Sequence, residues 1–173
     1  ATLILMVAGR GIAQLITGAR LLTTGYPPFM AMGRSYFLGL PLPVFLWAGV
    51  FVVIGLITKR TALGMFIESV GINASASRYS GVNAKNVKLL AYVISGVCAG
   101  FAGLIYASRI AVADANNAGL NYELDAILAV VIGGTSMAGG KFSLVGSMIG
   151  AMIIRTIITT VYYFGIAAEA TMV

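Results

Sequence analysis

Long apolar runs separated by short polar segments dominate the chain. A helix needs about 20 mostly apolar residues to cross the hydrocarbon core of a bilayer, so these runs are candidate membrane helices. They cover residues 3–22, 44–58, 89–111, 124–138 and 142–168. The fourth run is short and carries two pairs of glycines, so it either spans or forms a re-entrant segment. The pattern predicts an all-α, polytopic transmembrane helical bundle of about four spanning helices plus this Gly-broken or re-entrant segment.

Composition supports a membrane protein and argues against a soluble enzyme. Hydrophobic residues make up 60% of the chain and charged residues 9%, whereas charged residues make up about 25% of ordinary soluble domains. So few charges cannot form the polar surface of a soluble globule. The chain has no His and only one Cys, Cys98, which excludes an internal disulfide and a Cys/His metal site. We therefore expect no metal site and no cofactor.

Basic residues concentrate in the segment 59–88, and this predicts its side of the membrane. Its charged residues are Lys59, Arg60, Arg78, Lys85 and Lys88, with Glu68 as the one acid. Loops rich in Lys and Arg stay on the cytoplasmic side, so we expect 59–88 to be a cytoplasmic loop. Segments 23–42 and 112–122 then lie outside. If the fourth run spans, Lys141 lies inside and Glu169 outside. The net charge of +6 thus reports orientation and gives no reason to expect a nucleic-acid partner.

Two GxxxG patterns at helical spacing predict close helix contacts. They are Gly96 with Gly100, and Gly146 with Gly150. Glycines four residues apart on one helix let a neighbouring backbone approach closely. With 22 glycines in the chain, such a pattern also arises by chance. For each pair, a specific helix–helix contact and a chance occurrence therefore both remain open.

Catalytic and nucleotide-binding chemistry is not supported by the motifs. The segment 134–142 resembles a phosphate-binding loop, but Thr135 stands where the first Gly is required and Phe142 where Ser or Thr is required. Glu123 and Asp125 are two residues apart, so on a helix they point in different directions and do not form an acid–base pair. Without His to serve as a base, we expect no catalytic residue.

Polar residues within or beside the apolar runs are candidates for a transport path. Charges at membrane depth usually face a bundle interior or a water-filled path, although a salt bridge or snorkelling is the alternative for Arg10 and Arg155. Amides and carboxylates after the third run suit a polar, uncharged solute such as a sugar; the alternative is a solvated external loop. Hydroxyls in a broken helix often line transport paths. The candidate path residues are Asn116, Asn117, Glu123, Asp125, Thr135, Ser136 and Arg155.

The segment 59–88 is long for a simple connection, and such segments are usually functional. It is either a docking surface for a soluble partner or an amphipathic piece lying on the bilayer.

Several stretches resemble one known family. Tyr122–Lys141 (YELDAILAVVIGGTSMAGGK) resembles the signature stretch of sugar-type ABC importer permeases, the ribose/galactofuranose branch of the branched-chain amino acid/ribose permease family. Glu68–Asn83 (ESVGINASASRYSGVN) is similar to the cytoplasmic coupling region of that family, and residues 1–11 to one of its mid-protein helices. Ala113–Leu120 (ADANNAGL) is most similar to the galactofuranose member.

The resemblance implies a multi-pass permease subunit of a bacterial plasma (inner) membrane. Such a subunit moves a pentose or hexose, with galactofuranose as one candidate, into the cell by alternating access. It pairs with a second copy or a paralogue, binds cytoplasmic ATPase subunits, and receives sugar from an extracytoplasmic binding protein. ATP hydrolysis is expected in the separate subunit. Residues before and after the matching part are expected in the family, so the chain reads as a C-terminal part.

Carried over by position, the resemblance assigns residues to two roles. The 114–136 region would lie near the sugar path, whereas Arg155 has no expected counterpart in the family. The residues expected to contact the ATPase are Glu68, Gly71, Ile72, Asn73, Ala74 and Ser77. A fragment of a secondary transporter or channel remains the alternative function, and a non-transporting membrane scaffold is a further one.

Overall fold

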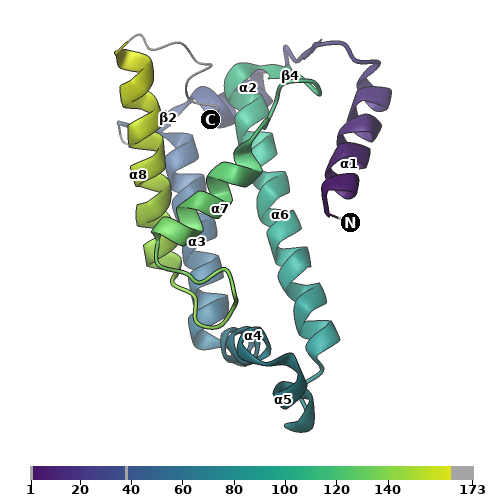
Figure 1. Ribbon diagram of the computed structural model, residues 1–173. Helices are drawn as coiled ribbons and strands as arrows, with labels where there is room; N and C mark the ends of the chain where they lie inside the picture. Colours follow the sequence, from purple (N-terminus) through teal and green to yellow (C-terminus); the bar gives the residue numbers. More distant parts are fainter. Residues whose placement is uncertain (1, 38, 165–173) are drawn as a thin grey trace. The chain divides into compact units, whose positions relative to one another are not determined.

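The computed structural model describes residues 2–37 and 39–164, and within them the chain is mostly helical (Figure 1). The helices are α1 Thr2–Thr17, α2 Pro27–Arg34, α3 Leu42–Arg60, α4 Ala62–Ile72, α5 Ala74–Tyr79, α6 Ala84–Ile110, α7 Tyr122–Ile132 and α8 Leu144–Tyr163. The described strands have two residues each: β1 Leu22–Thr23, β2 Tyr36–Phe37, β3 Leu40–Pro41 and β4 Val112–Ala113. β1 pairs with β4, and β2 with β3, both antiparallel.

Three of the described helices are long and apolar enough to cross a membrane. They are α3, α6 and the Leu144–Val161 part of α8. Their large apolar side chains are mostly exposed, as at Leu56, Val97 and Ile157. Such surfaces suit lipid or neighbouring helices rather than water. The predicted all-α membrane fold is confirmed. Of the four expected spanning helices, the one at 3–22 is not among these three, because α1 has only 16 residues.

Several expected boundaries differ from the observed ones. α1 ends at Thr17 rather than 22, because Gly18 and Ala19 turn the chain into the left-handed region, with φ of 61° and 53°. The region 59–88 is not an open loop but holds α4, α5 and the first turn of α6. α8 starts at Leu144, and the expected residues 165–168, like Glu169, lie outside the described residues.

The expected break in the fourth run is confirmed. α7 ends at Ile132, and no helix follows until Leu144. Gly134, Gly139 and Gly140 all have positive φ, a conformation that glycine adopts without steric cost. These glycines therefore end the helix and shape the loop 134–143, which we call the α7–α8 loop.

The described chain forms two compact parts, described separately here. The first comprises residues 2–54 and 91–120, and the second 55–90 and 121–164. In the first part, α2 approaches the end of α6 so closely that a Cβ on Gly33 would lie 2.6 Å from the Ser108 hydroxyl oxygen. Arg34 Nε donates to the carbonyl oxygen of Arg109 at 3.2 Å. This contact places a cation at the negative end of the α6 dipole.

In the second part, α7 and α8 form a tightly packed pair (Figure 1). A Cβ on Gly146 would collide with the carbonyl oxygen of Gly133, and one on Gly150 with that of Ala129. The GxxxG contact predicted at Gly146 and Gly150 is confirmed. A Cβ on Gly96 or Gly100, by contrast, would meet nothing within 4 Å, so that pattern makes no such contact in the described structure.

Candidate transport path and coupling site

The end of α7 and the chain just after it enclose a small hollow. Gly134, with φ of +83°, reverses the chain, so the amide of Thr135 donates back to the carbonyl oxygen of Val130 at 3.1 Å. This turn brings residues 135–137 against the last two turns of α7. The resulting hollow has a volume of about 330 Å³ and is lined by Ala126, Ile127, Val130, Val131, Thr135, Ser136 and Met137.

Two hydroxyl groups are the polar side chains of this hollow. Thr135 Oγ1 accepts from the amide of Ser143 at 3.5 Å, and Ser136 Oγ accepts from the amide of Ala138 at 3.2 Å. Neither hydroxyl donates a hydrogen bond to another of the described residues. An apolar wall with a few polar groups is the usual make-up of a small-molecule site. Two hydroxyls with donors to spare suit a ligand that carries hydroxyl oxygens.

Glu123 and Asp125 lie in the first turn of α7, near the other end of that helix from the hollow's hydroxyls. Negative charges there are stabilised by the positive end of the helix dipole. Neither carboxylate lines the hollow. The structure therefore places these two predicted path residues on α7 but away from Thr135 and Ser136.

Arg155 lies over an aromatic ring. Its guanidinium carbon is 4.9 Å from the ring centroid of Tyr122, which joins α8 to the first residue of α7. Such a cation–π contact is worth about 0.5–2 kcal/mol. This pairing is neither the salt bridge nor the path-lining position considered from the sequence, and Arg155 does not line the hollow.

Asn116 and Asn117 belong to the first part of the chain and order its loop after β4. The carboxylate of Asp114 accepts from the backbone amides of Asn116 and Asn117, at 2.8 and 3.2 Å. It also accepts from the side-chain nitrogen Nδ2 of Asn117 at 2.9 Å. Asn116 also receives a bond of 2.9 Å from Gln14 Nε2 in α1. The Asn117 side chain, followed by the Asn116 amide, lowers the pKa of Asp114 below its ordinary value of 3.8. Both asparagines thus have local partners within the first part of the chain.

The residues expected to contact an ATPase lie on α4, at Asn73 and on α5. Asn73 Oδ1 accepts from the amides of Ser75 and Ala76, both at 3.0 Å, and so caps α5. Ser77 is buried and donates to the carbonyl oxygen of Asn73 at 2.9 Å. These two side chains hold the α4–α5 corner. Large side chains that this corner presents outward include Ile72, at 69% exposure, and Tyr79 at the end of α5.

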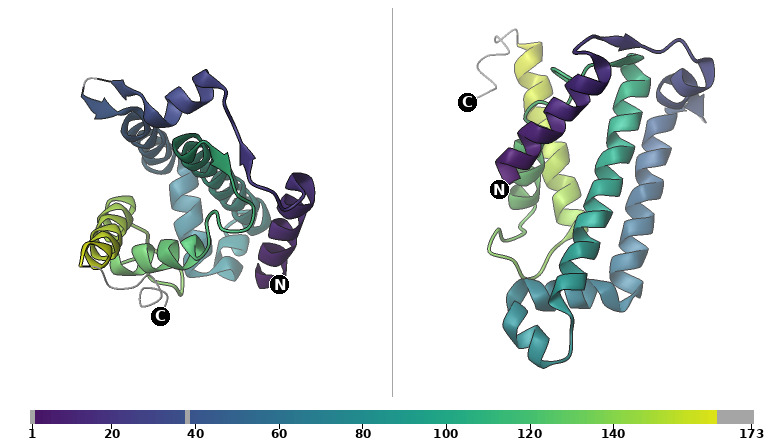
Figure 2. Two further views of the ribbon diagram at one scale, coloured as in Figure 1. Left: turned by 90° about the horizontal axis from the view of Figure 1, so that it is seen from above. Right: turned by 90° about the vertical axis from the view of Figure 1, so that its right-hand side faces the viewer.

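The end of α4 meets the α7–α8 loop mainly through backbone atoms (Figure 1 and Figure 2). A Cβ on Gly71 would lie 3.0 Å from the amide nitrogen of Gly140. A Cβ on Gly139 would lie 2.5 Å from the carbonyl oxygen of Gly71. Three glycines therefore permit the contact, and it joins the expected coupling segment to the loop that carries Thr135 and Ser136. The sequence pointed to Gly71 by resemblance alone and to the glycine pair only as a helix break.

Comparison with known proteins identifies the family of this fold. The whole chain, residues 1–173, matches the family described as "Branched-chain amino acid transport system / permease component". The chain belongs to this permease family. The family is that of a transport component rather than an enzyme, and the permease chain is a multi-pass membrane protein.

The permease chain is also similar to curated sugar permeases. It is 51% identical to the galactofuranose transporter permease protein of Escherichia coli (strain K12), over 100% of this chain and 51% of that protein. It is 43% identical to the fructose import permease protein of Bifidobacterium longum (strain NCC 2705), over 98% of this chain and 49% of that protein. It is 42% identical to the ribose import permease protein of Haemophilus influenzae (strain ATCC 51907 / DSM 11121 / KW20 / Rd), over 89% of this chain and 49% of that protein.

The permease chain thus spans about half the length of the curated relatives that it matches. No solved structure matches it at a significant level.

Proposed function

We propose that the chain is part of the membrane-spanning subunit of an ATP-driven sugar importer in a bacterial inner membrane. The names of three relatives, each a permease for a sugar, support sugar as the substrate class. The chain carries no intact phosphate-binding loop, so the energy would come from a separate ATPase. An extracytoplasmic binding protein would deliver the sugar, and a second copy or a paralogue would complete the translocation unit.

The backbone contact between Gly71 and the α7–α8 loop carries this proposal. ATPase subunits that close on ATP would displace the α4–α5 corner, on which Ile72 is an exposed anchor. Gly71 would pass that displacement to Gly139 and Gly140. Because backbone atoms of the two segments lie this close together, displacement of the helix end would displace the loop.

Movement of this loop would change the sugar's surroundings. Thr135 and Ser136 are part of the same loop and face the hollow beside α7. Their hydroxyls would donate to sugar oxygens in one state and lose those partners when the loop shifts. In this form of alternating access, movement of the α4–α5 corner would displace the residues after Gly134.

Uptake of a panel of labelled pentoses and hexoses tests the function. The full-length permease is produced with its binding protein, once with and once without the ATPase subunit. We expect saturable uptake of one sugar or of a few related sugars, only with an ATPase that hydrolyses ATP. Uptake that survives loss of ATP hydrolysis and instead collapses with the ion gradient would show a secondary transporter, and non-saturable uptake would show a channel.

A further inference from the structure

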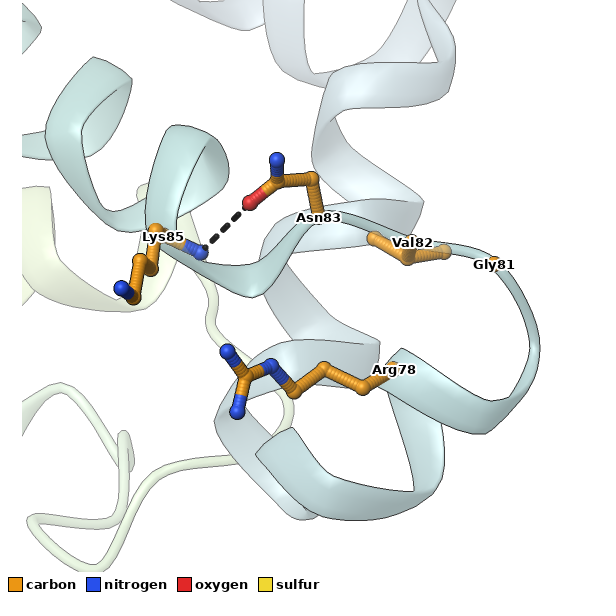
Figure 3. Close-up of a pocket in the computed structure, with 5 residues that line it drawn as sticks. All are labelled: Arg78, Gly81, Val82, Asn83 and Lys85. Carbon is orange, nitrogen blue, oxygen red and sulfur yellow. Dashed lines mark hydrogen bonds between the residues drawn. The ribbon is translucent and has the colours of Figure 1, made fainter.

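A second hollow lies between α5 and α6, next to the α4–α5 corner and formed by residues that the transport proposal does not name (Figure 3). It has a volume of about 450 Å³ and is lined by Arg78, Gly81, Val82, Asn83 and Lys85. Arg78 extends from the end of α5 towards the first turn of α6, where Lys85 lies. Two cations and no acid line this hollow, which we call the basic pocket.

The backbone of the basic pocket is fixed by its own hydrogen bonds. Gly81, with φ of +83°, donates its amide to the carbonyl oxygen of Arg78 at 3.0 Å, and Val82 donates to that of Ser77 at 3.0 Å. Asn83 Oδ1 accepts from the backbone amides of Lys85 and Asn86, at 3.2 and 3.4 Å, and so holds the start of α6 (Figure 3). The turn therefore holds its shape without a ligand, and a ligand need not order it.

The position of the pocket along α6 sets its height in the membrane. The uncharged stretch Leu89–Ser108 of α6 is about 30 Å long at 1.5 Å per residue, which equals the thickness of the hydrocarbon core. Lys85 precedes Leu89 by one helical turn, or about 6 Å. The headgroup layer on each side of the core is about 5–8 Å thick. The basic pocket thus lies at the level of the lipid phosphates.

Exposed apolar side chains flank the pocket on both sides. Tyr79 is 93% exposed and follows Arg78 directly, and Leu89 is 65% exposed on the same face of α6 as Lys85. Tyrosine prefers the membrane interface, and leucine prefers the hydrocarbon. A soluble partner would leave Leu89 uncovered, whereas a phospholipid places its phosphate at Lys85 and its acyl chain along Leu89.

We propose that the basic pocket binds the headgroup phosphate of an anionic phospholipid. Arg78 offers a planar fork of donors and Lys85 a point charge. The excess of basic residues in 59–88 places the pocket at the cytoplasmic leaflet. The bound lipid would anchor the corner between α5 and α6. This inference requires α6 to span the membrane, but it does not require the ATPase or the sugar.

Competition between two lipids tests the site. The full-length permease is purified in detergent with equal amounts of phosphatidylglycerol and phosphatidylcholine, and bound lipids are counted by native mass spectrometry. A hydrogen bond to a charged group contributes about tenfold in affinity, so the double variant Arg78→Gln/Lys85→Gln, which removes both charged donors of the pocket, should bind phosphatidylglycerol at least about thirtyfold more weakly. Lys59→Gln/Arg60→Gln removes the same charge outside the pocket and should retain binding within about threefold.

Three results would overturn the lipid site. An equal loss of phosphatidylglycerol binding in the two double variants would show general charge attraction and no specific site. Unchanged phosphatidylglycerol binding in Arg78→Gln/Lys85→Gln would show that the pocket does not bind the lipid. Loss of ATPase-subunit binding with phosphatidylglycerol binding intact would make the pocket a protein-docking surface. The charge-keeping variant Arg78→Lys/Lys85→Arg should bind phosphatidylglycerol normally, and the same unfolding temperature in all variants shows that the fold is kept.

Discussion

The carbonyl oxygen of Gly71 lies 2.5 Å from the point that a Cβ on Gly139 would occupy. Gly71 is the last residue but one of α4, and Gly139 lies in the loop after α7. Any side chain at Gly139 would therefore push the two segments apart. The expected coupling segment and the residues of the candidate sugar path meet at this one point, which makes the contact the centre of the functional proposal.

Close packing of α7 on α8 predicts a stability difference between two glycines. Gly150→Ala would drive a methyl group against the carbonyl oxygen of Ala129, and such overpacking typically costs about 1–3 kcal/mol. Gly96→Ala meets nothing within 4 Å, and in a helix this change is favourable by up to about 1 kcal/mol. Unfolding midpoints in detergent micelles compare the two variants. Equal stability would contradict the packing.

The contact between Arg155 and Tyr122 predicts a measurable coupling energy. A double-mutant cycle of Arg155→Gln and Tyr122→Leu should give about 0.5–2 kcal/mol, because the guanidinium lies over the ring. Unfolding in detergent of the wild type, the two single variants and the double variant measures it. Arg155→Lys keeps the charge and should lose less stability than Arg155→Gln. Strictly additive single effects would show that the two side chains do not interact.

The hydrogen bonds to Asp114 predict a pH effect. The bond from Asn117 lowers the pKa of Asp114 below 3.8 in the folded chain. Its stabilisation is therefore complete above the unfolded value and is lost as the pH falls through the lowered folded pKa. Asn117→Ala should raise the pKa of the Asp114 carboxyl towards 3.8, as followed by NMR titration of a carbon-13-labelled chain. An identical titration in wild type and variant would rule this contact out.

Hydroxyl groups in the hollow beside α7 predict an effect on sugar affinity. Thr135→Val and Ser136→Ala should each raise the KM of uptake about 2- to 12-fold, the value of one hydrogen bond of 0.5–1.5 kcal/mol. Met137→Leu lines the same hollow and conserves its volume, so it should leave the KM unchanged. Uptake assays with the full-length permease measure all three variants. A KM that rises equally in Met137→Leu would point to general disturbance of the loop.

The sequence predicted the helices well because apolar length directly determines which segments cross a bilayer. It also predicted the break after α7, because two pairs of glycines destabilise a continuous helix there: Gly133 with Gly134, and Gly139 with Gly140. It did not predict that Gly71 would meet Gly139, because no local pattern encodes a contact between distant backbones. The hydrogen bonds of Asn116 and Asn117 to Asp114 and Gln14, and the position of Thr135 and Ser136 at one hollow, were likewise not predictable, because they depend on the course of the chain between the helices.

The ratio of sugar moved to ATP hydrolysed tests the coupling contact most directly. Gly134 and Gly139 lie in the same short stretch and have φ of +83° and +92°, so alanine is equally strained at both. Only at Gly139 would its methyl group meet Gly71, whereas at Gly134 it would meet nothing within 4 Å. The ratio is measured in proteoliposomes that hold the full-length permease, its ATPase and its binding protein. We predict that Gly139→Ala lowers the ratio at least tenfold while hydrolysis continues, and that Gly134→Ala keeps it. The same ratio in both variants would contradict the account.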